Sequence, residues 1–215
     1  CRGVVICLKD CLDGMEPLPG NCIRVMAGVT MARAAVFAAN HGLSGLEFAH
    51  GIPGTVGGGV YMNAGAYGGE MSGICRNVTL MDEAGQLREV NARELEFSYR
   101  HSKLQESGEI VINAVLQLQP AAPEEIKQKM RELQAKRLAS QPLDYPSAGS
   151  AFKRPVGGYA AALIDQAGLR GFQVGQAAIA RKHTGFAINL GGATAAEMRE
   201  LLTQVSDRVF RQTGI

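Results

Sequence analysis

The sequence has little net charge, no long apolar run and no recognisable targeting segment. Its formal net charge is +2 over 215 residues, which is too small to indicate nucleic acid as the main partner. No apolar stretch approaches the length of a membrane-spanning helix. The first residues do not combine a basic stretch with an apolar core and a cleavage site. We therefore expect no nucleic-acid partner, no membrane partner and no signal peptide.

Cysteines are few, odd in number and crowded into the N-terminal third. The five are Cys1, Cys7, Cys11, Cys22 and Cys75. A zinc site would need two close pairs or nearby histidines, and only Cys7 and Cys11 lie close together in the sequence. The spacing favours free thiols in a reducing cytoplasm, with a redox-active pair as the alternative. We expect no metal site.

The remaining composition is that of an ordinary globular protein, with 46% hydrophobic and 20% charged residues. A chain of 215 residues can form one large domain or two small ones. Pro120 and Pro123 flank the start of a helix whose first turn carries Glu124 and Glu125 at its positive end. We therefore expect a first domain over residues 1–120 and a second over residues 121–215.

Hydrophobic periodicity and turn signals predict an α+β fold rather than a doubly wound sheet. The expected strands are Val4–Leu8, Ile23–Ala27, Val78–Met81, Gln86–Val90, Ile110–Gln119, Gln176–Ile179 and Phe186–Leu190. In the fifth strand, alternation predicts one face made of Ile110, Ile112, Ala114, Leu116 and Leu118. The expected helices are 31–40 with Thr30 as cap, 121–139, 159–167 and one that follows the capping box 194–197. We expect a loop over residues 141–155.

Residues 51–69 are unusually rich in glycine, with eight glycines among nineteen residues. Each glycine loses much backbone entropy on ordering, so this density needs a physical reason. One reason is the close approach of a phosphate or a flat ring system to backbone N–H groups. The alternative is a purely structural loop. Glycine content alone leaves these two interpretations equally open, and the G-x-G-x-x-G dinucleotide pattern is not present.

The order of residues says more than their number. Residues 52–58 read Ile-Pro-Gly-Thr-Val-Gly-Gly, which resembles the flavin-contacting loop of the vanillyl-alcohol-oxidase-like FAD-binding fold. Five stretches resemble UDP-N-acetylenolpyruvoylglucosamine reductases in order and spacing: residues 46–54, 63–68, 97–102, 146–155 and 182–189. The uninterrupted run from residue 63 to residue 99 resembles the second type of this family. The resemblance covers nearly the whole chain.

This resemblance implies a more specific α+β architecture. Residues 1–120 would form the second subdomain of a vanillyl-alcohol-oxidase-like FAD-binding domain. Residues 121–215 would form a small α+β substrate-binding domain. We expect the family's N-terminal FAD subdomain and its final Leu-Glu-Pro-Glu strand, which carries a catalytic glutamate, to lie outside these 215 residues. On that expectation, the chain alone is inactive and does not hold FAD tightly.

The resemblance also implies a reaction. NADPH reduces FAD, and the flavin passes a hydride to UDP-N-acetylglucosamine enolpyruvate, which gives UDP-N-acetylmuramate for peptidoglycan synthesis. This step serves cell wall biogenesis, cell shape and cell division. The expected cofactor-binding residues are Gly51, Ile52, Pro53, Gly54, Thr55, Val56, Gly57, Gly58, Asn63, Ala64 and Gly65.

The same resemblance assigns roles outside the glycine-rich stretch. Arg100 would stabilise the developing enolate, because a guanidinium stays charged and can bind a carboxylate or enolate through two bonds. Ser150 would donate the proton, with Ser147 as the competing candidate. The residues expected to bind substrate are Lys153, Gln176, Lys182 and Asn189, with Arg154 as a further cation nearby.

Two other interpretations stay open. A different FAD enzyme of the same fold, such as an oxidase of small alcohols, would share residues 52–58 but not the motifs around Ser150 and Lys182. A non-catalytic nucleotide-sugar binding module would bind the UDP-sugar without flavin.

Overall fold

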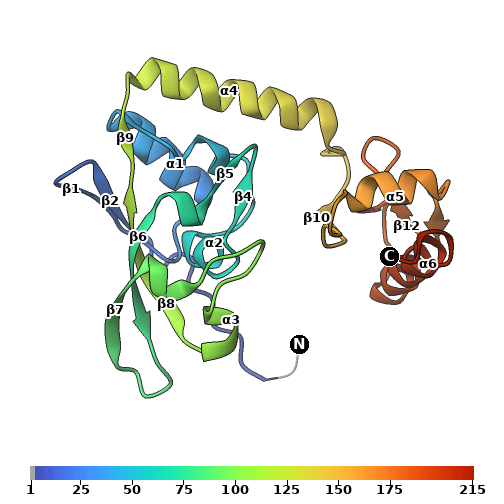
Figure 1. Cartoon of the computed structure of the whole chain (residues 1–215), viewed down its shortest axis with the longest axis horizontal. Helices are drawn as coiled ribbons and strands as arrows, with labels where there is room; N and C mark the ends of the chain where they lie inside the picture. Colours follow the sequence, from blue (N-terminus) through green and yellow to red (C-terminus); the bar gives the residue numbers. More distant parts are fainter. Residues whose placement is uncertain (1–2) are drawn as a thin grey trace. The chain divides into compact units, whose positions relative to one another are not determined.

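The computed structural model describes residues 3–215 and divides the chain into two compact units, Cys1–Ala135 and Lys136–Ile215 (Figure 1). The long helix α4, Pro123–Ser140, spans the division. Its first turn contains Pro123 and two glutamates, as the sequence predicts, and it buries Ile126 and Met130. The boundary at residue 120 between cofactor and substrate domains stays a prediction. In the part of the chain that the structure describes, no helix is both long and apolar enough to cross a membrane.

An antiparallel five-stranded sheet forms the centre of the first unit, in the order β1-β2-β8-β6-β7. Its strands are β1 Met15–Leu18, β2 Cys22–Met26, β6 Cys75–Met81, β7 Leu87–Asn91 and β8 Ile110–Gln117. Two small sheets pair β3 Leu43–Ser44 with β9 Gln119–Pro120 and β4 Gly65–Ala66 with β5 Gly69–Glu70. The predicted hairpin between β6 and β7 is confirmed. The carboxylate of Asp82 accepts bonds from the N–H groups of Ala84 and Gln86 in its turn.

Short helices in the first unit connect these strands. They are α1 Met31–Asn40, α2 Val56–Tyr61, α3 Leu104–Ser107 and the 3-10 turns η1 Glu47–Ala49, η2 Met71–Gly73 and η3 Ala92–Leu95. The predicted cap of α1 is confirmed, because Thr30 Oγ1 accepts a hydrogen bond from the Arg33 N–H at 3.2 Å. The helix buries Met31 and four alanines in the core. Small side chains let α1 lie close to the rest of the unit.

Two predictions for the first unit are wrong. Residues 4–8 form no strand, and the side chains of Val4, Val5 and Ile6 are 74–90% exposed. The Leu8 carbonyl instead starts a turn, where it accepts bonds from the N–H groups of residues 11 and 12. This apolar run has β propensity but no partner strand in the described residues, and an unpaired strand is not stable in water.

The alternation predicted along β8 is also wrong at its first residues. Ala114, Leu116 and Leu118 are buried as expected, but Val111 is buried where Ile110 and Ile112 were predicted to be. The pairing with β6 shifts register between Thr79 and Leu80. A bulge adds one residue, and one residue is enough to exchange the two faces of a strand.

The four described cysteines are free thiols. Cys7 and Cys11 are exposed, whereas Cys22 and Cys75 are buried in the first unit. Burial raises the pKa of the Cys75 thiol to about 12, so this cysteine stays protonated at neutral pH and packs as a small apolar residue.

In the second unit, an antiparallel four-stranded sheet packs against two helices. The strand order is β10-β13-β12-β11, with β10 Ser147–Ser150, β11 Gln173–Val174, β12 Ala177–Ile179 and β13 Phe186–Asn189. The helices are α5 Ala160–Gln166 and α6 Ala195–Thr213. The predicted capping box is confirmed at the start of α6, and Leu201, Val205 and Val209 are buried on its inner face. Thus both units mix strands with separated helices, and the α+β prediction is confirmed.

The expected loop over residues 141–155 is partly wrong, because it contains β10. Ser147 pairs with Ile188 and Ser150 with Phe186, with an irregularity between the two pairs. Gly and Ala have low β propensity, so the local sequence does not favour a strand here. The pairing with β13 imposes the extended conformation instead.

Candidate active site

The glycine-rich stretch begins as a tight loop that leads into helix α2. Thr55 caps this helix, and its side chain lies 3.5 Å from the Gly58 N–H. The N–H of Val56 donates to the Val29 carbonyl at 2.8 Å, and the N–H of Gly57 donates to the Ala27 carbonyl at 2.9 Å. Two N–H groups that were expected to face a cofactor therefore hold the loop to the end of β2.

Several of these glycines are explained by packing within the protein. A Cβ atom on Gly57 would lie 2.8 Å from the Ala27 Cβ, and one on Gly59 would lie 2.8 Å from the Met31 Sδ. A Cβ on Gly69 would meet the ring of Phe48 at 2.5 Å. These positions let α2 and the β5 strand approach their neighbours more closely than any side chain would allow. The structural interpretation of the glycines therefore holds for at least these three.

The first half of the loop has the character expected of a ligand site. Pro53 and Gly54 are exposed, and a Cβ on Gly54 would meet nothing within 4 Å. Gly54 also has φ +126°, a conformation that residues with side chains rarely adopt. Beside it, within residues 3–215, His50 Nδ1 is the buried side-chain nitrogen that lacks a hydrogen-bond partner. Such an atom calls for a polar partner, so this end of the loop fits a bound cofactor.

Residues 63–65 and Arg100 meet in the structure, although 35 or more residues separate them in the sequence. The Arg100 guanidinium donates to the Asn63 carbonyl at 3.3 Å and to the Gly65 carbonyl at 2.6 Å. The Asn63 side chain is 1% exposed. Its amide nitrogen donates to the Ser98 carbonyl, and its oxygen accepts from the Ser72 N–H, both at 2.9 Å. The structure thus uses the Asn63 side chain to hold the segment before Arg100.

Arg100 lies in a tight turn with a constrained backbone. Ser98 and His101 exchange backbone hydrogen bonds of 3.1 and 3.2 Å, which leaves Tyr99 and Arg100 at the tip. Arg100 has φ +54°, in the left-handed region that favours glycine or asparagine. Its guanidinium also lies 5.3 Å from the centre of the Tyr99 ring. A strained backbone at a charged residue is frequent at functional sites.

The sequence did not single out Ser102 or Gln105, which stand next to this turn. Ser102 is fully buried, and its Oγ donates to the Tyr61 carbonyl at 2.7 Å. The exposed Gln105 amide lies 3.2 Å from the Tyr61 carbonyl and 3.1 Å from the Arg100 carbonyl. The one signal for Ser102 was its place in the 97–102 motif. It was missed because a polar residue in such a motif is easily taken for a turn residue.

Glu47 carries a buried charge just before the loop. Its carboxylate accepts bonds from the Ser44 hydroxyl at 2.6 Å and the Gly45 N–H at 2.9 Å, and Lys129 Nζ lies 3.7 Å away. Burial raises the pKa of Glu47, but these hydrogen bonds and the nearby ammonium together outweigh burial and lower it. The carboxylate is therefore ionised at neutral pH and fixes the chain that enters residues 50–54.

In the second unit, β10 presents Ser150 at an edge of the sheet. Side chains of directly paired residues lie on the same face, so Ser147 and Ser150 share the face of Ile188 and Phe186. This face carries a buried cluster of Ala178, Ala180, Phe186 and Ile188, opposite the face that packs against α6. Ser150 itself is exposed. Gly149 next to it has φ +89°, and its N–H donates to Ser147 Oγ at 3.2 Å.

The four predicted substrate residues are not joined to one another or to Ser150 by hydrogen bonds within the described residues 3–215. The side chains of Lys153 and Gln176 are exposed, so they can turn toward a ligand. Lys182 Nζ donates to the Leu138 carbonyl at 2.5 Å, near the C-terminal end of α4. The Asn189 side-chain oxygen accepts bonds from the N–H groups of residues 191 and 193, at 2.9 and 3.0 Å, and thereby fixes the turn before α6.

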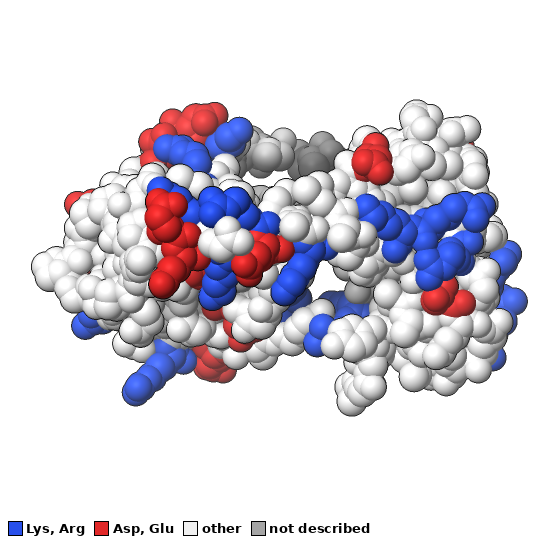
Figure 2. Space-filling view, turned by 90° about the horizontal axis from the view of Figure 1, so that it is seen from above, with Lys and Arg blue, Asp and Glu red and all other residues white. Residues whose placement is uncertain are grey.

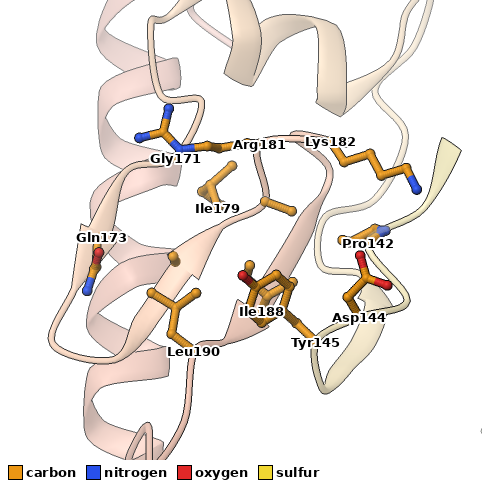
Figure 3. Close-up of a pocket in the computed structure, with 12 residues that line it drawn as sticks. Pro142, Asp144, Tyr145, Gly171, Gln173, Ile179, Arg181, Lys182, Ile188 and Leu190 are labelled. Carbon is orange, nitrogen blue, oxygen red and sulfur yellow. The ribbon is translucent and has the colours of Figure 1, made fainter.

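A cavity of about 250 Å³ lies beside Ile188 on the second unit's sheet (Figure 3). Ile188, Leu190 and Tyr145 supply much of its apolar surface, and Lys182 also lines it. Figure 3 shows Arg181 and Lys182 pointing in opposite directions from the loop between β12 and β13. Because its cations do not converge, the cavity is not a compact anion site. Ser150 and Lys153 do not line it.

The two units differ in charge. Residues 136–215 contain ten Lys or Arg against five Asp or Glu, whereas residues 1–135 contain twelve against fifteen. Figure 2 shows several of these cations gathered on one face of the second unit. The second unit is therefore the part that favours an anionic ligand.

Known families match two separate parts of the chain. Residues 1–91 match a family model described as an FAD binding domain. Residues 141–215 match the model of the UDP-N-acetylenolpyruvoylglucosamine reductase C-terminal domain. A crystal structure of UDP-N-acetylenolpyruvylglucosamine reductase from Thermus caldophilus superposes with a TM-score of 0.79 and 41% identity. That match covers 86% of this chain and 68% of the other.

Curated relatives extend the likeness along nearly the whole chain. A UDP-N-acetylenolpyruvoylglucosamine reductase from Agathobacter rectalis is 50% identical over 197 residues, which cover 91% of this chain and 63% of the relative. One from Streptococcus pneumoniae is 43% identical over 214 residues, which cover 100% of this chain and 70% of the relative. The chain thus spans roughly two thirds of the length of these relatives. By these matches, the chain belongs to the UDP-N-acetylenolpyruvoylglucosamine reductase family.

Proposed function

We propose that this protein reduces UDP-N-acetylglucosamine enolpyruvate to UDP-N-acetylmuramate, with FAD as the cofactor and NADPH as the electron source. The observation that carries the proposal is the meeting of Arg100 with residues 63–65, at the end of the stretch that resembles a flavin loop. This contact supports a permanent cation beside the region where we propose that the flavin binds. The family membership supports the identity of the substrate.

The first unit would hold the FAD. When bound, FAD supplies the hydride for the substrate. The proposed contacts are made by residues 51–58 and by the chain at 63–65. Open space at Gly54 and the unpartnered His50 Nδ1 support an approach to the first half of the loop. Asn63 is completely buried and bonded on both sides, so we assign its contribution to its backbone.

Arg100 and Ser150 would act on the substrate itself. A guanidinium has five N–H donors, and the two bonds of Arg100 to carbonyls leave others for a carboxylate or enolate oxygen. Ser150 is exposed on a glycine-containing strand, where its hydroxyl can reach a bound substrate and deliver a proton to carbon. The proton would be replaced from solvent. Ser147 is the competing donor because it lies on the same face.

The second unit would bind the anionic part of the substrate. Its excess of cations suits a diphosphate and a carboxylate, and Lys153, with its exposed side chain, lies three residues after Ser150. Lys182, Gln176 and Asn189 are proposed as further contacts. The reaction would supply the muramate unit of peptidoglycan. It therefore serves cell wall biogenesis, cell shape and cell division, and we place it in the cytoplasm.

The test is a direct assay of the purified protein at its natural length. We expect it to carry FAD and to oxidise NADPH continuously, beyond the reduction of its own flavin, only in the presence of UDP-N-acetylglucosamine enolpyruvate, with UDP-N-acetylmuramate identified by mass spectrometry. Oxygen consumption with a small alcohol, and no reaction with the UDP-sugar, would show an oxidase instead. Binding of the UDP-sugar by a protein that holds no flavin would show a binding module.

A further inference from the structure

Ser102 is a fully buried polar residue with a single, well-defined bond. Its hydroxyl donates to the Tyr61 carbonyl at 2.7 Å, and it lies two residues after Arg100. Tyr61 is the last residue of α2, so its carbonyl has no partner within the helix. The bond therefore joins the end of the flavin-loop helix to the segment that carries Arg100.

Helix α2 offers a rigid reference for such a bond. Its N-terminal end is held to residues 27–29, just after β2, through the backbone bonds of Val56 and Gly57, and the missing side chains of Gly57 and Gly59 let it lie directly on Ala27 and Met31. The chain that leaves its C-terminal end runs through residues 63–65, whose carbonyls receive the Arg100 guanidinium. A group fixed to Tyr61 is therefore fixed relative to the whole loop.

The Arg100 turn needs such an anchor because its backbone is strained. The left-handed φ of +54° is unfavourable for an arginine, and the turn at residues 98–101 has two backbone bonds of its own to oppose that strain. Asn63 holds the turn from one side, through the Ser98 carbonyl. Ser102 holds it from the other side. The Gln105 amide adds one bond to the same Tyr61 carbonyl and one to the Arg100 carbonyl, but it is exposed and water competes for it.

We propose that Ser102 is a positioning residue, which sets the place of the Arg100 guanidinium through its buried bond to the Tyr61 carbonyl. This inference rests on the proposed function, because it assumes that Arg100 acts on the substrate. Without the Ser102 hydroxyl, the turn relaxes toward an ordinary backbone conformation and the guanidinium moves away from the reacting oxygen. Reduction of the substrate then slows, whereas reduction of the flavin by NADPH does not.

The experiment compares Ser102→Ala with Ser107→Ala in the FAD-loaded protein. Ser107 is the control, because it lies in the neighbouring helix α3, is exposed and bonds to Glu109, away from the Arg100 turn. Stopped-flow absorbance follows the two half-reactions separately. We expect Ser102→Ala to slow flavin reoxidation by the UDP-sugar at least tenfold and to leave flavin reduction by NADPH within twofold. Both rates of Ser107→Ala stay within twofold of the unmodified protein.

Ser102→Cys is the conservative variant, because a thiol is a weaker donor of similar shape. Its rate of flavin reoxidation by the UDP-sugar should fall between those of the unmodified protein and Ser102→Ala. It replaces the alanine variant if that variant does not fold. Equal slowing of both half-reactions, or no slowing at all, would overturn the role. Hydrogen exchange at the His101 N–H gives a readout without turnover, and we expect it to speed up at least fivefold in Ser102→Ala. Unchanged exchange would also overturn the proposal. An unmodified protein that reduces its flavin but never the UDP-sugar would refute the proposed function instead.

Discussion

The proposed functional residues of the two units are held in opposite ways. In the first unit, residues 55–65 and the Arg100 turn are bound to each other and to the sheet by backbone and side-chain hydrogen bonds, many of them buried. In the second unit, all of which the structure describes, Ser150 and Lys153 are exposed, and their side chains lack comparable bonds. One half has its geometry fixed in the free protein. The other presents groups that a bound substrate must organise.

Because of this difference, mutations in the two units should have different effects. A change in the first unit should disturb packing, and thus stability, as well as chemistry. A change at an exposed residue of the second unit should alter chemistry alone. Each of the following predictions tests one side of this comparison.

The largest expected effect is on catalysis, from Ser150→Ala. A positioned proton donor typically contributes a factor of about 10²–10⁴, and we expect a loss of that size in the rate of substrate reduction. Flavin reduction by NADPH should not change. Because Ser150 is exposed, the midpoint of thermal unfolding should also stay the same, in contrast to changes in the first unit.

Ser147→Ala is the matched control, since Ser147 shares the face and the strand of Ser150. Steady-state assays and stopped-flow absorbance measure the two variants side by side. If Ser147→Ala loses more activity than Ser150→Ala, the proton donor is Ser147 and our assignment is wrong.

The sequence predicted the features that local residue chemistry sets, and it missed those that depend on a tertiary partner. The caps at Thr30 and Thr194, the β6–β7 hairpin and the final helix depend on local residue chemistry, and the structure confirms them. The stretch at residues 4–8 and the strand β10 depend on which partner is available, which local sequence does not reveal. The bulge near Thr79 is a tertiary feature as well, and it reversed the predicted faces at the start of β8.

For the site, the order of the motifs singled out Arg100, Ser150 and the glycine-rich loop. It did not reveal the role of each glycine. Sequence alone cannot distinguish a glycine that admits a ligand from one that admits a neighbouring helix. Gly54 faces open space, whereas Gly57 lies against Ala27. In the same way, Asn63 was predicted as a cofactor contact because of its motif, and its bonds to Ser98 and Ser72 became visible only in three dimensions.

The next largest effect concerns stability, and it compares Gly57→Ala with Gly58→Ala. The new Cβ on Gly57 would lie 2.8 Å from the Ala27 Cβ, so we expect a loss of about 1–3 kcal/mol in the free energy of unfolding. On Gly58 the nearest atom is 3.8 Å away, and alanine should be neutral or stabilise the helix by up to about 1 kcal/mol. Urea unfolding measures both. Equal losses of stability in the two variants would show that the backbone conformation of the loop, rather than its packing against Ala27, requires glycine.

An effect of similar size is expected from Glu47→Gln, and it depends on pH. The folded state lowers the pKa of Glu47, so its ionised carboxylate stabilises the fold above the unfolded pKa near 4.5. That contribution is lost as the pH falls through the folded pKa. At neutral pH we expect Glu47→Gln to cost about 1–3 kcal/mol, the range for hydrogen bonds to a buried charged group. The cost should shrink as the solution becomes more acidic than pH 4.5.

Unfolding by urea across a pH series measures this effect, and Glu124→Gln is a suitable control because that carboxylate is exposed and pairs with a lysine only 3 residues away. A cost for Glu47→Gln that stays constant down to pH 3 would show that the residue acts through its shape rather than its charge.

The smallest effect belongs to His183 in the second unit. Its Nδ1 accepts a bond from the Gly185 N–H at 3.1 Å, and its ring meets Phe186 at 4.8 Å. Burial lowers the pKa of His183 below 6.5, although its own backbone hydrogen bond opposes this shift. The neutral ring therefore stabilises the second unit above the unfolded pKa, and this contribution is lost as the pH falls through the folded value. Protonation of Nδ1 removes the bond to Gly185, which is worth about 0.5–1.5 kcal/mol. Because Glu47 responds only in more acidic solution, hydrogen-exchange protection, taken relative to the intrinsic rate at each pH, should fall in the second unit before the first as the pH drops below 6.5. Equal loss of protection in both units over that range would show that the two do not respond to pH separately.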